Sequence, residues 1–216
     1  MVYGSAAVWA AQFHKIYEQV LQIFPSAWAA CTAHFAGRYV AEQTVTNKLV
    51  LCLRKEQQVQ LGPVGWYVQP SYTLLTELLS GDPTTKGIID FVVKFGHTER
   101  IYFAFECKWL NVVRRSRRCS QVAPYIEQGL MRYVKAKYAE DLPRAAVIGY
   151  VFDADTAFCL SRLTRRISRG ATKAQLTAVR NLSPLLLGAK TIVRFESEHH
   201  RPLAPIVVEH LLCPYQ

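Results

Sequence analysis

Apolar residues recur at helical spacing in two stretches near the start of the chain, residues 6–23 and 41–57. In the second stretch the residues that share one face are Val45, Leu49, Cys52 and Leu53. The sequence LGPVGW, which ends at Trp66, then interrupts the pattern with glycine and proline. We therefore expect two amphipathic helices before the first strand.

Several later stretches favour strands, because β-branched and aromatic residues dominate them. The clearest is IIDFVVKF at 88–95, and residues 66–79 and 100–110 have a similar composition. Between them, SGDPTTKG at 80–87 predicts a loop, and GHTE at 96–99 predicts a turn.

Residues 120–139 predict a helix in which Ser120 is the N-cap and Pro124 lies in the first turns, where proline is tolerated. The apolar stripe of this helix consists of Ile126, Leu130, Tyr133, Val134 and Tyr138. AAVIGYVF at 145–152 is apolar throughout, as in a strand buried on both faces. A basic helical region follows, and the sequences TIVRF and APIVVEHLL predict two final strands.

The strand, helix and strand between residues 100 and 152 make a βαβ unit, whose two strands should be parallel and joined by a right-handed crossover. The strand at 88–95 should form an antiparallel hairpin with the strand that follows it. The predicted class is therefore α/β, with a mixed central sheet flanked by helices. A chain of 216 residues, half of them hydrophobic, fits one domain. Its core would cover about 41–152, with a helical addition before it and an α/β addition after it.

The segment FAFECKWL, which begins at Phe103, carries two charges on a strand that is otherwise apolar. Strand alternation puts Glu106 and Lys108 on the same face. Charged side chains are rarely buried unless they are paired or bind a metal, so both need a partner. Asp90 can supply it: if the turn centres on Thr98, opposed residues have numbers that sum to 196, and Asp90 faces Glu106. A turn centred half a residue earlier would shift the pairing by one residue.

Two carboxylates at one point of a sheet repel each other, and a hard divalent cation removes that repulsion. Mg²⁺ commonly uses one or two protein carboxylates together with water and phosphate oxygens. Lys108 lies two residues beyond Glu106, where it can hold or activate an attacking water and offset phosphate charge. These groups suit metal-assisted hydrolysis of a phosphodiester. The alternative is that Glu106 and Lys108 form surface ion pairs on an edge strand, although an edge strand with so few polar positions is unusual.

At these residues the chain resembles the PD-(D/E)xK nuclease superfamily, whose members share the restriction-endonuclease-like fold. IID at 88–90 stands where the family has Pro-Asp, with isoleucine in place of the proline, and ECK at 106–108 matches E-x-K. The spacing and the order of helices and strands also fit, over about residues 41–152. The resemblance implies a Mg²⁺-dependent phosphodiesterase, with Mn²⁺ as a substitute, in which Asp90 and Glu106 hold the metal and Lys108 is catalytic.

The resemblance also implies a further acidic residue on the helix before the sheet. Glu42 is the first candidate, and its alternative role is to interact with the dipole of the helix at whose start it stands. Glu77, on the strand that leads toward Asp90, is the competing candidate. Gln128 lies where some related nucleases place a glutamine toward the site. Tyr133 follows it by five residues rather than four, so the match is imperfect, and a position on a solvated helix face explains Gln128 better.

The chain has 26 Lys and Arg against 16 Asp and Glu, a formal net charge of +10. Such an excess favours a polyanionic partner, most simply nucleic acid, although a protein can also be basic without one. Two segments concentrate the charge, and we expect both to contact phosphates unless they are only solvated. The first follows the E-x-K strand at the mouth of the expected site and comprises Arg114, Arg115, Arg117 and Arg118. The second shares one helical face and comprises Arg162, Arg165, Arg166 and Arg169.

Other residues with chemical potential have simpler explanations. The six cysteines form no CxxC pair and indicate reduced thiols, and strand alternation turns Cys107 away from Glu106. The adjacent His199 and His200 suit a loop at a strand end better than a metal site. The aromatic residues that could stack on bases are Trp66, Tyr67 and Trp109, for which core positions are the alternative.

The expected function is therefore a Mg²⁺-dependent nuclease that hydrolyses nucleic acid, DNA rather than RNA. The alternatives are a catalytically silent nucleic-acid-binding module on the same fold and a protein-interaction module. Expected partners are nucleic acid and either a second copy of the chain or another protein. No apolar run is long enough for a membrane span and no signal peptide is evident, so the expected location is the cytoplasm.

Overall fold

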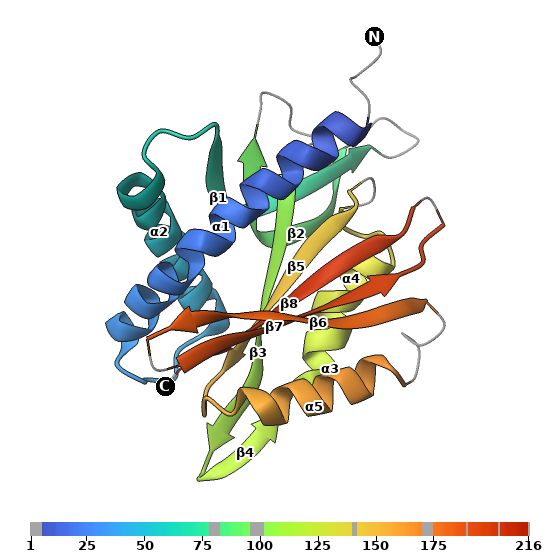
Figure 1. Cartoon of the computed structure of the whole chain (residues 1–216). Helices are drawn as coiled ribbons and strands as arrows, with labels where there is room; N and C mark the ends of the chain where they lie inside the picture. Colours follow the sequence, from blue (N-terminus) through green and yellow to red (C-terminus); the bar gives the residue numbers. More distant parts are fainter. Residues whose placement is uncertain are drawn as a thin grey trace.

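The computed structural model describes residues 6–77, 83–95, 102–139, 142–169, 175–188, 190–202 and 204–215. These residues form an α/β structure in which helices flank a mixed sheet of eight strands (Figure 1), and this confirms the predicted fold class. The strands are β1 (Trp66–Glu77), β2 (Pro83–Phe95), β3 (Tyr102–Arg114), β4 (Arg117–Ser120), β5 (Arg144–Val151), β6 (Leu176–Leu187), β7 (Lys190–His199) and β8 (Ile206–Pro214). The α-helices are α1 (Ala6–Phe35), α2 (Glu42–Glu56), α3 (Val122–Tyr125), α4 (Met131–Val134) and α5 (Thr156–Ile167), and two π-helical segments are η1 (Gln57–Leu61) and η2 (Ile126–Leu130).

The order of strands across the sheet is β1-β2-β3-β5-β8-β7-β6, and β4 pairs with β3 outside this path. The β2–β3 pair is antiparallel and the β3–β5 pair is parallel, as the sequence predicts for these elements. The β5–β8 pair is also parallel, whereas β1–β2, β7–β8 and β6–β7 are antiparallel. The apolar strands β3, β5 and β8 therefore occupy the middle of the sheet, where both faces are covered.

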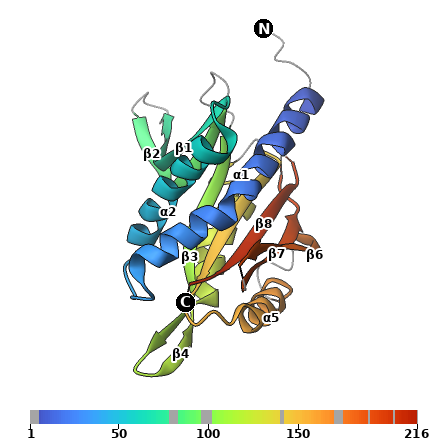
Figure 2. The same cartoon turned by 60° about the vertical axis from the view of Figure 1, so that its left-hand side comes forward.

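Helices cover the two faces of the sheet differently (Figures 1 and 2). One face is covered by α1 and α2, and the indole of Trp28 on α1 stacks on Tyr150 of β5 at 5.2 Å between ring centroids. The other face carries α3, η2 and α4 as one continuous helical rod, with α5 packed beside it. The side chains of Glu106 and Lys108 point toward this rod, because Gly129 of η2 lies against the aliphatic part of Lys108.

Several element boundaries differ from those that the sequence suggested. The first helix continues past Pro25 to Phe35, and Pro83–Gly87 of the expected loop belongs to β2. The expected helix at 120–139 begins at Val122 and ends at Val134, so Ser120 is the last residue of β4 and does not cap it. The strands β4 and β6 were not predicted. The expected turn GHTE lies outside the described residues.

A series of buried polar side chains runs from the rod across β8 to β7. Tyr125 Oη lies 2.9 Å from His210 Nδ1, and Ser197 Oγ lies 2.8 Å from both His210 Nε2 and His199 Nε2. His199 is thus a buried residue of β7 and does not lie in a strand-end loop, whereas His200 after it is exposed. Burial lowers the pKa of His199 to about 4 and holds the pKa of His210 well below its usual range.

These two histidines should make the protein sensitive to acid. The unfolded chain binds protons on them near pH 6.5 and the folded chain does not, so the free energy of unfolding should fall as the pH drops from about 6.5 toward 4. The lowered pKa of His199 alone corresponds to a loss of about 3 kcal/mol in the free energy of unfolding. Chemical denaturation of His199→Gln and of the exposed-site control His34→Gln across this range tests it. An equally steep pH dependence in His199→Gln and the control would contradict this account.

Candidate active site

The candidate site lies where β2 and β3 separate. Their paired residues run from Lys94 opposite Tyr102 to Phe91 opposite Phe105, and the numbers of each pair sum to 196. The register predicted from the sequence is therefore confirmed. Asp90 and Glu106 follow directly after the last pair, at the point where the ladder ends.

Beyond this point, two side-chain carboxylates take the place of the β2 backbone as hydrogen-bond partners of β3. The backbone N–H of Cys107 donates to Asp90 Oδ2 at 2.8 Å, and the N–H of Trp109 donates to Glu42 Oε2 at 2.7 Å. An unpaired buried N–H is costly, so these bonds fix both carboxylates at the strand edge. Glu42 is the first residue of α2. The entry of this helix therefore lies beside the end of the β2–β3 ladder, and the structure brings Glu42 together with Asp90.

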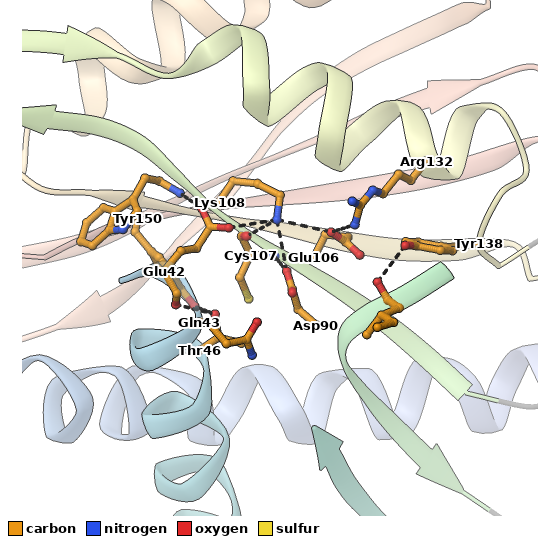
Figure 3. Close-up of polar contacts among 12 residues, drawn as sticks. Glu42, Gln43, Thr46, Asp90, Glu106, Cys107, Lys108, Arg132, Tyr138 and Tyr150 are labelled. Atoms are coloured by element: carbon orange, nitrogen blue, oxygen red, sulfur yellow. Dashed lines mark hydrogen bonds and ion pairs between the residues drawn. The ribbon is translucent and has the colours of Figure 1, made fainter. Parts of the chain in front are cut away.

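The ammonium group of Lys108 lies at the centre of the site (Figure 3). Its Nζ donates to the carbonyl oxygen of Cys107 at 2.7 Å and to Glu42 Oε1 at 3.1 Å. It also lies 3.4 Å from Asp90 Oδ2 and 3.6 Å from Glu106 Oε2. Three carboxylates thus converge on one cation, and the residues of the predicted Asp-Glu-Lys set lie on the same face of the sheet.

Glu106 is the most deeply buried member, with no exposed side-chain surface. Arg132 of α4 donates from Nη1 to Glu106 Oε2 at 2.9 Å. The other oxygen, Oε1, is buried and has no hydrogen-bond partner among the described residues. Exposure increases toward Asp90 and Glu42, whose side chains are 16% and 33% exposed. The cluster therefore opens to solvent on the side of β2 and α2.

The formal charges do not balance, because three carboxylates face two cations. Burial and, to a smaller extent, the charge of Asp90 raise the pKa of Glu106 to about 8, although Lys108 and Arg132 oppose the shift. Burial alone would lower the pKa of Lys108, but the neighbouring carboxylates outweigh it and raise that pKa. The site thus holds a firmly protonated lysine and a carboxyl group that has too little positive charge around it.

Arg132 was not predicted from the sequence, and the π-helical segment η2 explains why. A π-turn contains one more residue than an α-turn, so it rotates the positions that follow it around the helix axis. Gly129 faces Lys108 in consequence, whereas the side chain of Gln128 is exposed. The available signal was a lone arginine beside the apolar stripe of this helix.

The backbone of Glu77, the competing acidic candidate, lies far from the cluster. It is the last residue of β1 and pairs with Pro83, seven residues before Asp90. At the rise of a strand this separation is about 20 Å. The structure therefore selects Glu42 and not Glu77 as the third carboxylate.

The first arginine segment does not form a loop at the mouth of the cluster, which corrects the sequence expectation. Arg114 pairs with Arg117 across a tight hairpin, in which Arg115 and Ser116 have φ of 48° and 59°. Arg114 lies six residues beyond Lys108 on β3, about 20 Å away. The side chain of Arg118 is paired with carboxylates, because its Nε lies 2.6 Å from Asp153 Oδ2.

The second arginine segment lies on α5 and just after its end, and its four members line one open pocket. The residues that form this pocket are Ser120, Val122, Ala123, Arg162, Arg165, Arg166 and Arg169. Cys159, Leu163 and Ile167 are the buried residues of α5, so the arginines occupy its outer face. The helical face that the sequence predicts is therefore found for Arg162, Arg165 and Arg166, whereas Arg169 follows the end of the helix.

The remaining candidates belong to the core or to the surface. Cys107 is fully buried and lies on the opposite face from Glu106, as predicted, and Trp66 and Trp109 are also buried. Tyr67 is 52% exposed.

None of the described helices combines the length and apolar character that a membrane crossing requires. Comparison of the chain with protein family models, with curated proteins and with solved structures finds no match.

Proposed function

We propose that the protein is a Mg²⁺-dependent nuclease whose catalytic cluster is formed by Asp90, Glu106, Lys108 and Glu42. One observation supports this most: the buried Glu106 and the half-buried Asp90 lie beside a lysine where β2 and β3 separate, in a cluster whose three carboxylates face only two cations. A purely structural core would replace such groups with apolar side chains at little cost. Groups of this kind are typical of functional sites.

The donor set fits a small hard cation. Glu106 Oε1 is buried and has no partner, and Asp90 lies beside it with one oxygen engaged by Lys108 and Cys107. Among the described residues no three His, Cys, Asp or Glu side chains already form a metal cage, because the Lys108 ammonium lies between the carboxylates. Mg²⁺ does not need such a cage, since it is usually held by one or two carboxylates, waters and substrate phosphate.

A bound Mg²⁺ would polarise the scissile phosphate and lower the pKa of an attacking water. Asp90 and Glu106 would hold it, and Glu42 would keep Lys108 in place through the 3.1 Å bond. Lys108 would orient the attacking water and stabilise charge on the phosphate. Arg132 engages Glu106 Oε2, so the unpartnered Oε1 would be available to hold the metal.

The second candidate is a catalytically silent nucleic-acid-binding module. The observation in its favour is that Lys108 already pairs with all three carboxylates. Incubation of the protein with plasmid, linear DNA and RNA, in Mg²⁺ or in chelator, separates the two. Cleavage only with Mg²⁺ supports the nuclease. Salt-dependent binding without cleavage would contradict it and favour the silent module, and the absence of both would contradict both candidates.

Metal affinity should depend on pH through Glu106. Its pKa of about 8 means that a proton competes with the metal at neutral pH, so affinity should rise by up to tenfold per pH unit until about pH 8 and then level off. Calorimetric titration of Mn²⁺ between pH 6 and 9 measures this. Glu106→Gln should bind weakly at every pH, and a flat affinity profile in the wild type would exclude Glu106 as a ligand.

A further inference from the structure

The arginine pocket between α5 and the start of α3 concentrates positive charge that the described residues do not balance. Arg162, Arg165, Arg166 and Arg169 line it, and no acidic residue of the described part of the chain is among its lining residues. None of the four has an ion pair with a carboxylate of the described part of the chain. By contrast, Arg118 nearby is paired with Asp153 and Asp155.

The geometry of this pocket suits a phosphate group. Its volume is about 490 Å³, within the range of roughly 300–1,000 Å³ that is common for ligand sites. Guanidinium groups bind phosphate oxygens in pairs of parallel hydrogen bonds, and Ser120 adds a hydroxyl donor to the lining. Four like charges around one pocket repel each other, and an anion removes that repulsion.

Two structural distances relate the pocket to the catalytic cluster. Ser120 lines the pocket and pairs with Asn111, which is three residues beyond Lys108 on β3. The rise of a strand therefore puts Asn111 about 10 Å from Lys108. Along the helical rod, Val122 lines the pocket and Arg132 contacts Glu106, ten residues later, so the helix gives about 15 Å. Phosphates of one strand of a duplex follow each other by about 3.4 Å along the axis, so these distances correspond to a few nucleotides.

We propose that this arginine pocket anchors a phosphate of the nucleic-acid strand a few nucleotides away from the bond that is cut. The distance between the pocket and the bond that is cut has a meaning only if the protein is the proposed nuclease. Phosphate binding by the pocket does not require cleavage. The anchor assigns the main phosphate contact to α5 and not to the β3–β4 hairpin, which lies farther from Lys108 and is partly neutralised by acids.

The test is the binding of fluorescent single-stranded and duplex DNA in chelator, measured by anisotropy over a range of salt concentrations. The variant Arg165→Gln/Arg166→Gln/Arg169→Gln removes three charges from the pocket. The matched control Lys15→Gln/Lys48→Gln/Lys55→Gln removes three charges from α1 and α2. We expect the pocket variant to lose at least about tenfold in affinity and to flatten the salt slope by roughly 2–3, because each lost contact accounts for about 0.7–0.9. The control should change both much less.

A charge-preserving variant, Arg165→Lys/Arg166→Lys/Arg169→Lys, should keep most of the salt slope. It also shows whether any loss in the glutamine variant comes from misfolding, which thermal unfolding checks directly. Equal losses in the pocket variant and the control would overturn the proposal, because they would indicate diffuse charge only. Tighter binding of polyglutamate than of DNA would also overturn it in favour of an acidic protein partner.

Comparison of circular and linear DNA shows whether the pocket binds a backbone phosphate or a terminal phosphate. A circular strand that binds through the pocket as well as a linear one assigns a backbone phosphate. Pocket-dependent binding only of linear strands with a 5′- or 3′-phosphate assigns a terminal phosphate, and both results support the anchor. If the wild type binds through the pocket but never cuts, the nuclease proposal fails and the anchor stands. If it cuts while the pocket variant binds like the control, only the anchor fails.

Discussion

Replacement of Lys108 by alanine should abolish Mg²⁺-dependent cleavage. The ammonium group lies 3.1–3.6 Å from all three carboxylates. Loss of one preorganised group that stabilises developing charge typically costs about 10²–10³ in rate. Lys108 also keeps the carboxylates together, so we expect a loss at the upper end of this range or beyond it. Single-turnover cleavage of a labelled duplex measures it.

The matched control for this change is Lys55→Ala, which removes the same charge from an exposed position of α2 and should leave the rate unchanged. Because Lys108 is nearly buried, its loss leaves three neighbouring carboxylates without the ammonium group that offsets their charge, and the variant should also unfold more easily. Cleavage is therefore compared at a temperature where circular dichroism shows both variants folded. A folded Lys108→Ala protein that cuts within about threefold of the wild-type rate would place the chemistry elsewhere.

Replacement of Asp90 by alanine should also abolish cleavage, but it should leave DNA binding intact or slightly stronger. Asp90 is one of the two proposed metal ligands, and its negative charge would repel a phosphate bound at the cluster. Removing a unit charge about 4 Å from another changes the energy by about 1 kcal/mol in water, so binding in chelator could tighten by up to roughly fivefold.

Asp90→Asn separates the catalytic role from the structural one. The amide oxygen of asparagine can still accept the Cys107 N–H, which Asp90 Oδ2 now accepts at 2.8 Å, but the side chain carries no charge for a metal. We expect Asp90→Asn to be as inactive as Asp90→Ala and to have nearly wild-type stability. Metal-dependent cleavage by Asp90→Asn would show that this carboxylate only supports the fold.

The central part of the fold could be predicted because its sequence signals are local. Alternating and continuous apolar runs identified β2, β3 and β5, and the length of the expected turn set the register that places Asp90 beside Glu106. The buried charges on β3 then required partners, and this requirement predicted the cluster. The sequence could not decide whether Glu42 belongs to the site or only interacts with the dipole of its helix, because the position of its side chain depends on how α2 packs against the sheet.

The missed strands have physical reasons. β4 is exposed and rich in arginine, so it shows no apolar alternation, and its turn lacks the glycine that usually marks such a hairpin. β6 contains Pro184, which usually excludes a central strand. It lies at the edge of the sheet, and its pairing with β7 shifts between Leu182 and Leu185, so the proline is accommodated there.

The arrangement around Glu106 could not be predicted at the level of single residues. The π-helical segment changes which residues of the rod face the sheet, and no periodic pattern reports a single inserted position. Arg132 therefore replaces Gln128 as the polar group near the cluster. The grouping of the α5 arginines into one pocket likewise depends on the contact between α5 and α3, which the sequence does not reveal.

The most direct measurement is the location of a metal in crystals of the protein soaked in Mn²⁺, found from its anomalous scattering. The account predicts a single strong peak bound by the carboxylates of Asp90 and Glu106 at about 2.0–2.2 Å, with Lys108 beside it. The same soak of Asp90→Ala crystals should show no peak at this position. A wild-type structure without manganese at the cluster, at a concentration that supports cleavage in solution, would contradict the account.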